Sequence, residues 1–123
     1  FLDSVDQFNL GIGGFIMAGT NTVIFTDASF DDQIKGKVSL VDFWAVWCGP
    51  CRQQGPIIDR LAEQLKDKNF VIGKLDVDSN PKIAQQFGVS SIPTLVVLKD
   101  GKEVKRFVGV QDADTLKKVL ESA

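Results

Sequence analysis

From residue 22 to its end, the chain alternates apolar runs with amphipathic segments. Short runs rich in β-branched and aromatic residues predict strands, and they lie at residues 22–25, 38–45, 70–77, 94–98 and 103–109. The run 38–45, VSLVDFWA, is almost continuously apolar, which indicates a strand whose two faces are both covered. We therefore expect a central sheet packed between helices.

Two helices are predicted in the first half of this region. Residues 28–34 predict a short helix, for which Asp27 is a suitable N-cap. After residue 51, apolar residues recur at the spacing of one helical face, at Ile57, Ile58, Leu61, Ala62 and Leu65. This second helix is expected to lie against the sheet.

Two more helices are predicted in the second half. Pro81 suits the first turn of a short helix, with Asn80 as its cap and Gly88 after its end. The last helix is expected to start near Asp112. The final two strands are joined by the sequence KDGK, and its Asp-Gly pair predicts a hairpin turn.

The predicted order is therefore β-α-β-α-β-α-β-β-α. Strands that alternate with helices pair in parallel through right-handed crossovers, and the closing hairpin adds an antiparallel pair. The pattern predicts one α/β domain over residues 22–123, with a central mixed five-stranded sheet flanked by four helices.

Residues 1–21 differ from this domain in composition. They contain no lysine or arginine, and their apolar stretch GIGGFIMAG is nine residues long, too short to cross a bilayer. We expect an N-terminal extension that is either a flexible tail or a strap packed on the domain. A membrane-proximal or partner-binding segment is the alternative.

Composition and charge narrow the classes of function. The 123 residues are 44% hydrophobic and carry a formal net charge of −2, which fits a single globular domain. Basic residues form no block, which argues against nucleic acid as a partner, and no apolar run approaches the ~20 residues of a membrane span. Histidine is absent, which excludes Cys-His and Ser-His-Asp catalysis and every histidine-containing metal site.

The only two cysteines, Cys48 and Cys51, lie three residues apart in AVWCGPCRQ. A structural disulfide between them would close too short a loop to add much stability. A zinc site needs about four ligands, and these two thiolates have neither a histidine nor a third cysteine to join them. A redox pair is the third interpretation, and the one that the pattern favours.

The position of the pair suits redox chemistry. Cys48 is expected where a strand ends and a helix begins, so that the unpaired N–H groups of the helix N-terminus stabilise an exposed thiolate. Pro50 fits the first helical turn, where a missing N–H costs nothing. Cys51 lies about one turn further on, and we expect the helix to cover it.

Three stretches of the chain form a recognisable set: VDFWAVWCGPC, GKLDVD and IPTLVVLKDG. Together they carry a resemblance of residues 22–123 to the thioredoxin family. The resemblance implies the thioredoxin fold and a protein-disulfide reductase. Cys48 would attack a substrate disulfide, and Cys51 would then attack Cys48 to release the reduced substrate. Thioredoxin reductase would restore the dithiol with NADPH, so that the protein itself needs neither a bound cofactor nor a metal.

Asp42 and Lys74 each interrupt an apolar strand. Alternation along the strand places Asp42 on one face with Leu40 and Trp44, and burial is expected to raise the pKa of its carboxyl group. The resemblance implies that Asp42 moves protons to or from Cys51 and that Lys74 lies beside it. An internal ion pair without a catalytic part is the alternative.

The resemblance also implies a substrate-binding surface, which comprises Trp47, Gly49, Pro50, Ile92, Pro93 and Gly109. The peptide bond before Pro93 is expected to be cis, with the backbone of Ile92 beside Cys48, where an extended substrate can pair with it. Gly109 is expected to leave room for that substrate, and a glycine that only interrupts the strand is the alternative.

The chain departs from the family pattern at Val46, where relatives often carry a charged residue or proline, and at Gln53 and Gln54, where many are apolar. We expect these changes to alter the docking surface and the redox poise. A thiol oxidant or isomerase and a non-catalytic binding subunit are the alternative functions, but Gly49-Pro50 resembles the reducing branch. We accordingly expect a cytoplasmic monomer whose partners are thioredoxin reductase and disulfide-containing proteins.

Overall fold

The computed structural model describes residues 19–123, so the extension predicted over residues 1–21 lies outside the described residues except for its last three. The strands are β1 (Val23–Ile24), β2 (Val38–Trp44), β3 (Phe70–Asp76), β4 (Thr94–Lys99) and β5 (Lys102–Val108). The helices are α1 (Phe30–Ile34), α2 (Gly49–Gln64), α3 (Pro81–Gln86) and α4 (Ala113–Ser122). The predicted order of elements is confirmed.

The five strands form one mixed sheet in the order β1-β3-β2-β4-β5. Strands β1, β3 and β2 are parallel, whereas β4 lies antiparallel to both β2 and β5. The predicted parallel pairing is therefore wrong for β4. Helix α3 has only six residues and spans about 9 Å, so the chain stays at the end of the sheet where β3 finishes and enters β4 from there.

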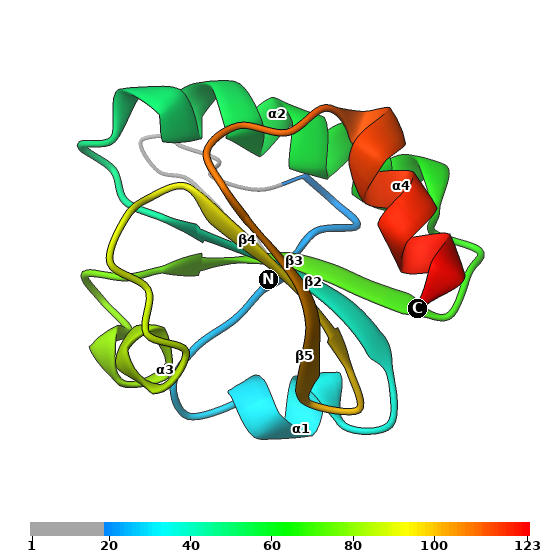
Figure 1. The fold of residues 1–123 in the computed structure, drawn as a ribbon, viewed down its shortest axis with the longest axis horizontal. Coiled ribbons are helices and arrows are strands. Elements are labelled where there is room, and N and C mark those ends of the chain that lie inside the picture. The colour runs from blue at the N-terminus through cyan, green and yellow to red at the C-terminus, as the bar shows by residue number, and fades with distance from the viewer. Residues whose placement is uncertain (1–18) are drawn as a thin grey trace.

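Helices cover both faces of the sheet, with α2 and α4 on one side and α1 and α3 on the other (Figure 1). Each face has its own apolar core. The α1/α3 side buries Phe25, Phe30, Ile34, Val41, Phe43, Leu75, Ile83, Ala84, Val96 and Leu98. The α2/α4 side buries Leu40, Ile58, Leu61, Ala62, Leu65, Ile72, Leu95, Val97, Leu116 and Leu120. The alternation along β2 that places Leu40 toward α2 carries Asp42 to the same face.

The sequence predicted that Asp27 caps α1, but in the structure it caps α3. Its two carboxylate oxygens accept the N–H groups of Lys82 and Ile83 at 3.0 and 2.9 Å, which are orphan donors at the start of α3. Asn80 makes no side-chain cap there and instead accepts the Asp27 N–H. Ser29 occupies the N-cap position of α1.

The predicted hairpin turn and the predicted cap of the last helix agree with the structure. Asp100 and Gly101 both have positive φ, 49° and 81°, as the two central residues of a type I′ hairpin require. Asp112 caps α4 by accepting the Thr115 N–H at 2.8 Å. No helix among residues 19–123 is long and apolar enough to cross a membrane.

Candidate active site

The two cysteines lie at the N-terminus of α2. Cys48 is the N-cap residue, with extended backbone angles of −87° and 114°, and Pro50 lies in the first turn. The Cys51 N–H donates to Cys48 Sγ at 3.3 Å, so one of the orphan donors of the helix points at the sulfur. The two residues form a disulfide, with Cα atoms 5.3 Å apart. The predicted place of Cys48, between strand and helix, is confirmed.

The prediction that Cys48 is exposed is wrong for this disulfide form. Cys48 and Cys51 are each only 4% exposed, because they pack with Ala45 and lie against Trp44, Val77 and Ile92. The neighbouring residues Gly49 and Pro50 are exposed. The pair therefore lies just beneath a surface formed by its own motif.

Trp47 supplies a large apolar part of that surface. Its side chain is 68% exposed, and its indole Nε1–H donates to Asp78 Oδ2 at 2.8 Å. Asp78, in the turn after β3, was not identified from the sequence. Its hydrogen bond holds the exposed ring beside the cysteines, and Val46, also exposed, continues the apolar surface.

The loop before β4 lies directly against the redox pair. The Ile92–Pro93 peptide bond is cis, as predicted, and the Ile92 carbonyl oxygen is 3.8 Å from Cys48 Sγ. The Gly109 N–H donates to the Pro93 carbonyl oxygen at 2.8 Å. Residues from α2, from the loop before β4 and from the end of β5 thus meet around Cys48.

Gly109 has a φ of +99°, a conformation that L side chains rarely adopt. A Cβ added there would meet nothing within 4 Å, so the space above it is open. The backbone conformation alone is enough to require glycine, and the room for substrate that the sequence suggested stays a prediction.

Asp42 is a buried carboxylate, 1% exposed. Neither of its oxygens has a hydrogen-bond partner among the residues that the structure describes. Burial raises the pKa of Asp42 to about 7, an effect that the positive charge of Lys74 opposes and the negative charge of Asp59 increases. Asp42 therefore exchanges a proton near neutral pH, as a group that shuttles protons needs to do.

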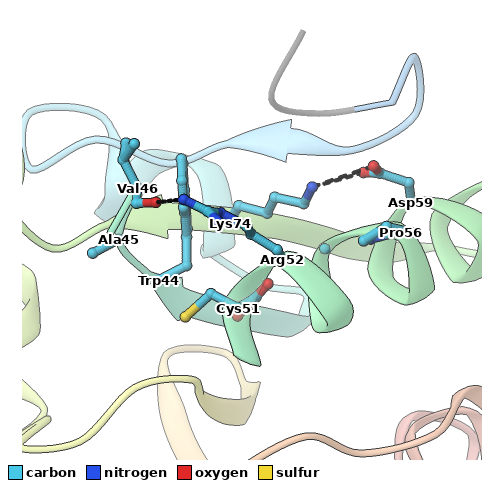
Figure 2. Close-up of a pocket in the computed structure, with 10 residues that line it drawn as sticks. Trp44, Ala45, Val46, Cys51, Arg52, Pro56, Asp59 and Lys74 are labelled. Atoms are coloured by element: carbon cyan, nitrogen blue, oxygen red, sulfur yellow. Dashed lines mark hydrogen bonds and ion pairs between the residues drawn. The ribbon is translucent and has the colours of Figure 1, made fainter. Parts of the chain in front are cut away.

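Lys74 is the neighbour of Asp42 in the parallel pairing of β2 with β3, as the sequence suggested. Its ammonium group pairs with the Asp59 carboxylate at 3.2 Å (Figure 2). Gly55 makes room for this group, since a Cβ there would lie 3.3 Å from Lys74 Nζ.

Asp59 is a residue that the sequence reasoning missed. It also accepts the Gly19 N–H at 2.9 Å and the Thr22 hydroxyl at 2.7 Å, so it ties α2 to the segment before β1. The sequence spacing could have identified Asp59. Cys51, Gly55 and Asp59 lie four residues apart, so they share one face of α2.

A cavity of about 410 Å³ connects these groups, and Asp42, Cys51, Asp59 and Lys74 all line it. Figure 2 shows Cys51 and Arg52 on α2 at one side of the cavity, with Lys74 reaching from the sheet toward Asp59. Asp42 and Cys51 therefore line a common cavity, and the two carboxylate oxygens of Asp42 are themselves buried.

Gln54 is not part of a docking surface, in contrast to the expectation from the sequence. It is wholly buried, and its side-chain amide exchanges two hydrogen bonds with the backbone of Gln111: Nε2 donates to the carbonyl oxygen at 3.1 Å, and Oε1 accepts the N–H at 2.7 Å. Gln53, one residue earlier, is exposed.

Within residues 19–123, no group of three or more His, Cys, Asp and Glu side chains is arranged to hold a metal ion. The two sulfurs that the structure brings into bonding contact are those of Cys48 and Cys51, and Asp42 lines the same cavity as Cys51.

Comparison with known proteins agrees with this geometry. The thioredoxin family model matches residues 21–122. Thioredoxin from Staphylococcus saprophyticus is 50% identical over 96 residues, which cover 78% of this chain and 91% of that protein, and thioredoxin from Staphylococcus aureus is 48% identical over the same shares. A mutant thioredoxin from Halobacterium salinarum has a solved structure that is 39% identical, with a TM-score of 0.74 over 85% of this chain and 93% of that one. The chain belongs to the thioredoxin family, and it is a thiol-disulfide oxidoreductase whose redox pair is Cys48 and Cys51.

Proposed function

We propose that this protein-disulfide reductase takes its electrons from NADPH through thioredoxin reductase and passes them to disulfide-containing proteins, with no cofactor bound to the chain itself. The observation that carries the proposal is the Cys48–Cys51 disulfide, which begins α2 and lies beside the backbone of Ile92. Reduction of this disulfide stores two electrons as two thiols, and its formation releases them to a substrate.

In the first step, the Cys48 thiolate attacks one sulfur of the substrate disulfide. A bond forms between Cys48 Sγ and that sulfur, the substrate S–S bond breaks, and the leaving sulfur departs as a thiolate that takes up a proton. The Cys51 N–H, which points at Cys48 Sγ, and the positive end of α2 both favour the charged form of the attacking sulfur.

In the second step, Cys51 Sγ attacks Cys48 Sγ. The Cys48–Cys51 bond forms, the bond between Cys48 and the substrate breaks, and the substrate sulfur departs as a thiolate that takes up a proton from solvent, which leaves the substrate as a dithiol. The Cys51 thiol must lose its proton before it attacks, and Asp42, which lines the same cavity, accepts it. A carboxyl group with a pKa of about 7 is suited to this transfer because both of its protonation states are populated at neutral pH. Lys74 places its positive charge near Asp42, where it favours the ionised carboxylate.

Substrate proteins dock on the surface around Cys48. Trp47, Gly49 and Pro50 form one side of it and are exposed. Ile92 and Gly109 form the other side, where an extended substrate segment pairs with the backbone of Ile92. The open space above Gly109 admits that segment. Pro93 is itself buried, and its cis peptide bond shapes the loop that presents the Ile92 backbone.

The reduction potential separates this function from that of a thiol oxidant on the same fold. The value typical of thioredoxins in general is about −270 mV, whereas strong oxidants lie near about −120 mV. We expect equilibration in a glutathione buffer to give a value near the reducing end, which fits a cytoplasmic reductase. A potential near the oxidising end would overturn both the direction of transfer and the location.

A further inference from the structure

Gln54 is a buried polar side chain whose hydrogen bonds reach far along the sequence. It lies one helical turn after Cys51, on the same face of α2, and is 0% exposed. Its amide both donates to and accepts from the backbone of Gln111, a residue 57 positions away. A buried amide is costly unless it is satisfied, so this reciprocal pair strongly favours one position of the segment around Gln111.

That segment is also held at a second point. Gly109, two residues before Gln111, donates its N–H to the Pro93 carbonyl oxygen at 2.8 Å. The Pro93 loop in turn places the Ile92 carbonyl 3.8 Å from Cys48 Sγ. The connection from β5 to α4 is therefore fixed to α2 through Gln54 and to the loop before β4 through Gly109.

We propose that Gln54 is a positioning residue for protein substrates: through Gln111 it fixes the β5–α4 connection and, with it, the side of the docking surface formed by Gly109 and the Pro93 loop. The inference deepens the proposed function, because it rests on substrate proteins docking at this surface. Gln54 does not contact the reacting sulfurs in this role.

The physical effect is preorganisation. Without the Gln54 amide, the N–H and carbonyl groups of Gln111 lose their buried partners, and the connection can take up other positions. A protein substrate would then have to order this segment as it docks, and that ordering costs binding free energy. A small disulfide that needs only Cys48 would not bear this cost.

The test compares two oxidants of the reduced protein. The rate constant for oxidation by insulin reports docking of a protein disulfide, and the rate constant for oxidation by dithiobis(nitrobenzoate) reports Cys48 alone. In Gln54→Met, which keeps the length of the side chain but not its hydrogen bonds, we expect the insulin rate constant to fall three- to tenfold. The small-disulfide rate constant and the equilibrium constant with glutathione should stay within twofold.

The matched control is Gln64→Met, the same change at an exposed position at the other end of α2, which should leave both rate constants unchanged. Equal insulin rates for folded Gln54→Met and the unaltered protein would overturn the proposal. An equal fall with both oxidants would overturn it too, because Gln54 would then act on the dithiol and not on docking. If the unaltered protein fails to reduce insulin, the proposed function itself is wrong.

Amide hydrogen exchange in the unaltered protein decides the matter if Gln54→Met does not fold. The inference requires the amides of Gln111 and Gly109 to be protected and to exchange together, as parts of one fixed segment. An unprotected Gln111 amide, or one that exchanges independently of Gly109, would contradict it.

Discussion

At the scale of single residues, one buried carboxylate links the stability of the fold to its chemistry. Asp42 is held without a hydrogen-bond partner among the described residues, and burial raises its pKa to about 7. The folded protein therefore holds a proton on Asp42 between about pH 4 and pH 7, where the unfolded chain has lost it. Stability falls as pH rises through this window, so the group that we propose for proton transfer destabilises the fold at neutral pH.

Asp42→Asn should remove this cost, because asparagine has a similar shape and cannot ionise. Relative to the unaltered protein, its free energy of unfolding should rise with pH between about 4 and 8, by up to about 4 kcal/mol for the full pKa difference. Denaturant unfolding of the two oxidised proteins at several pH values measures it. A stability difference that is the same at pH 5 and pH 8 would show that Asp42 titrates at its ordinary pKa.

Asp59→Asn should lower the pKa of Asp42. It removes a like charge that raises this pKa, and it takes the partner carboxylate from Lys74, whose positive charge then favours ionised Asp42 more strongly. The carboxyl carbon resonance of Asp42 and the pH dependence of insulin reduction should both shift to lower pH. Glu63→Gln, an exposed change on the same helix, is the control; an unmoved Asp42 resonance in Asp59→Asn would refute the coupling.

The sequence predicts the site residues that interrupt a pattern and misses those that do not. Asp42 and Lys74 stand out because each places a charge inside an apolar strand. Asp59 and Asp78 lie in a helix and a turn, where carboxylates are common, so only the folded chain reveals their contacts with Lys74 and Trp47.

At the scale of elements, the N–H groups at two helix N-termini make functionally and structurally important contacts, one with the Cys48 sulfur and one with a distant part of the chain. The start of α2 directs the Cys51 N–H at Cys48 Sγ, and Pro50 in its first turn makes this start predictable. The start of α3 is satisfied by Asp27 from a distant part of the chain. Local capping patterns cannot anticipate a cap delivered by tertiary structure, which is why the sequence pattern assigns Asp27 to the wrong helix.

Asp27→Ala should destabilise the protein by about 1 kcal/mol, within the roughly 0.5–2 kcal/mol typical of lost caps, because two N–H groups of α3 lose their acceptor. Asp67→Ala, at an exposed position in the turn after α2, should change stability by no more than about 0.5 kcal/mol. Denaturant unfolding measures both. Equal stabilities for the two variants would mean that solvent replaces the Asp27 cap without loss.

At the scale of the whole molecule, the fold brings the redox site together at one end of the sheet. Strands β2 and β3 end there, α2 begins there, and the loop into β4 and the connection after β5 pass the same end (Figure 1). The order of elements and the core on each face of the sheet followed from hydrophobic patterning, because apolar residues recur along each strand and helix at the spacing typical of that element. The direction of β4 did not, since it depends on where the chain travels after the short α3.

The central claim is that Cys48 attacks the substrate and Cys51 resolves the mixed disulfide. Trapping tests it most directly: reduced Cys51→Ser is mixed with insulin, and the disulfide adducts are mapped by mass spectrometry. A stable adduct through Cys48 should accumulate, because serine cannot displace the substrate sulfur, and Cys48→Ser should form at least tenfold less adduct. A comparable yield through Cys51 in Cys48→Ser would contradict the assignment of the nucleophile.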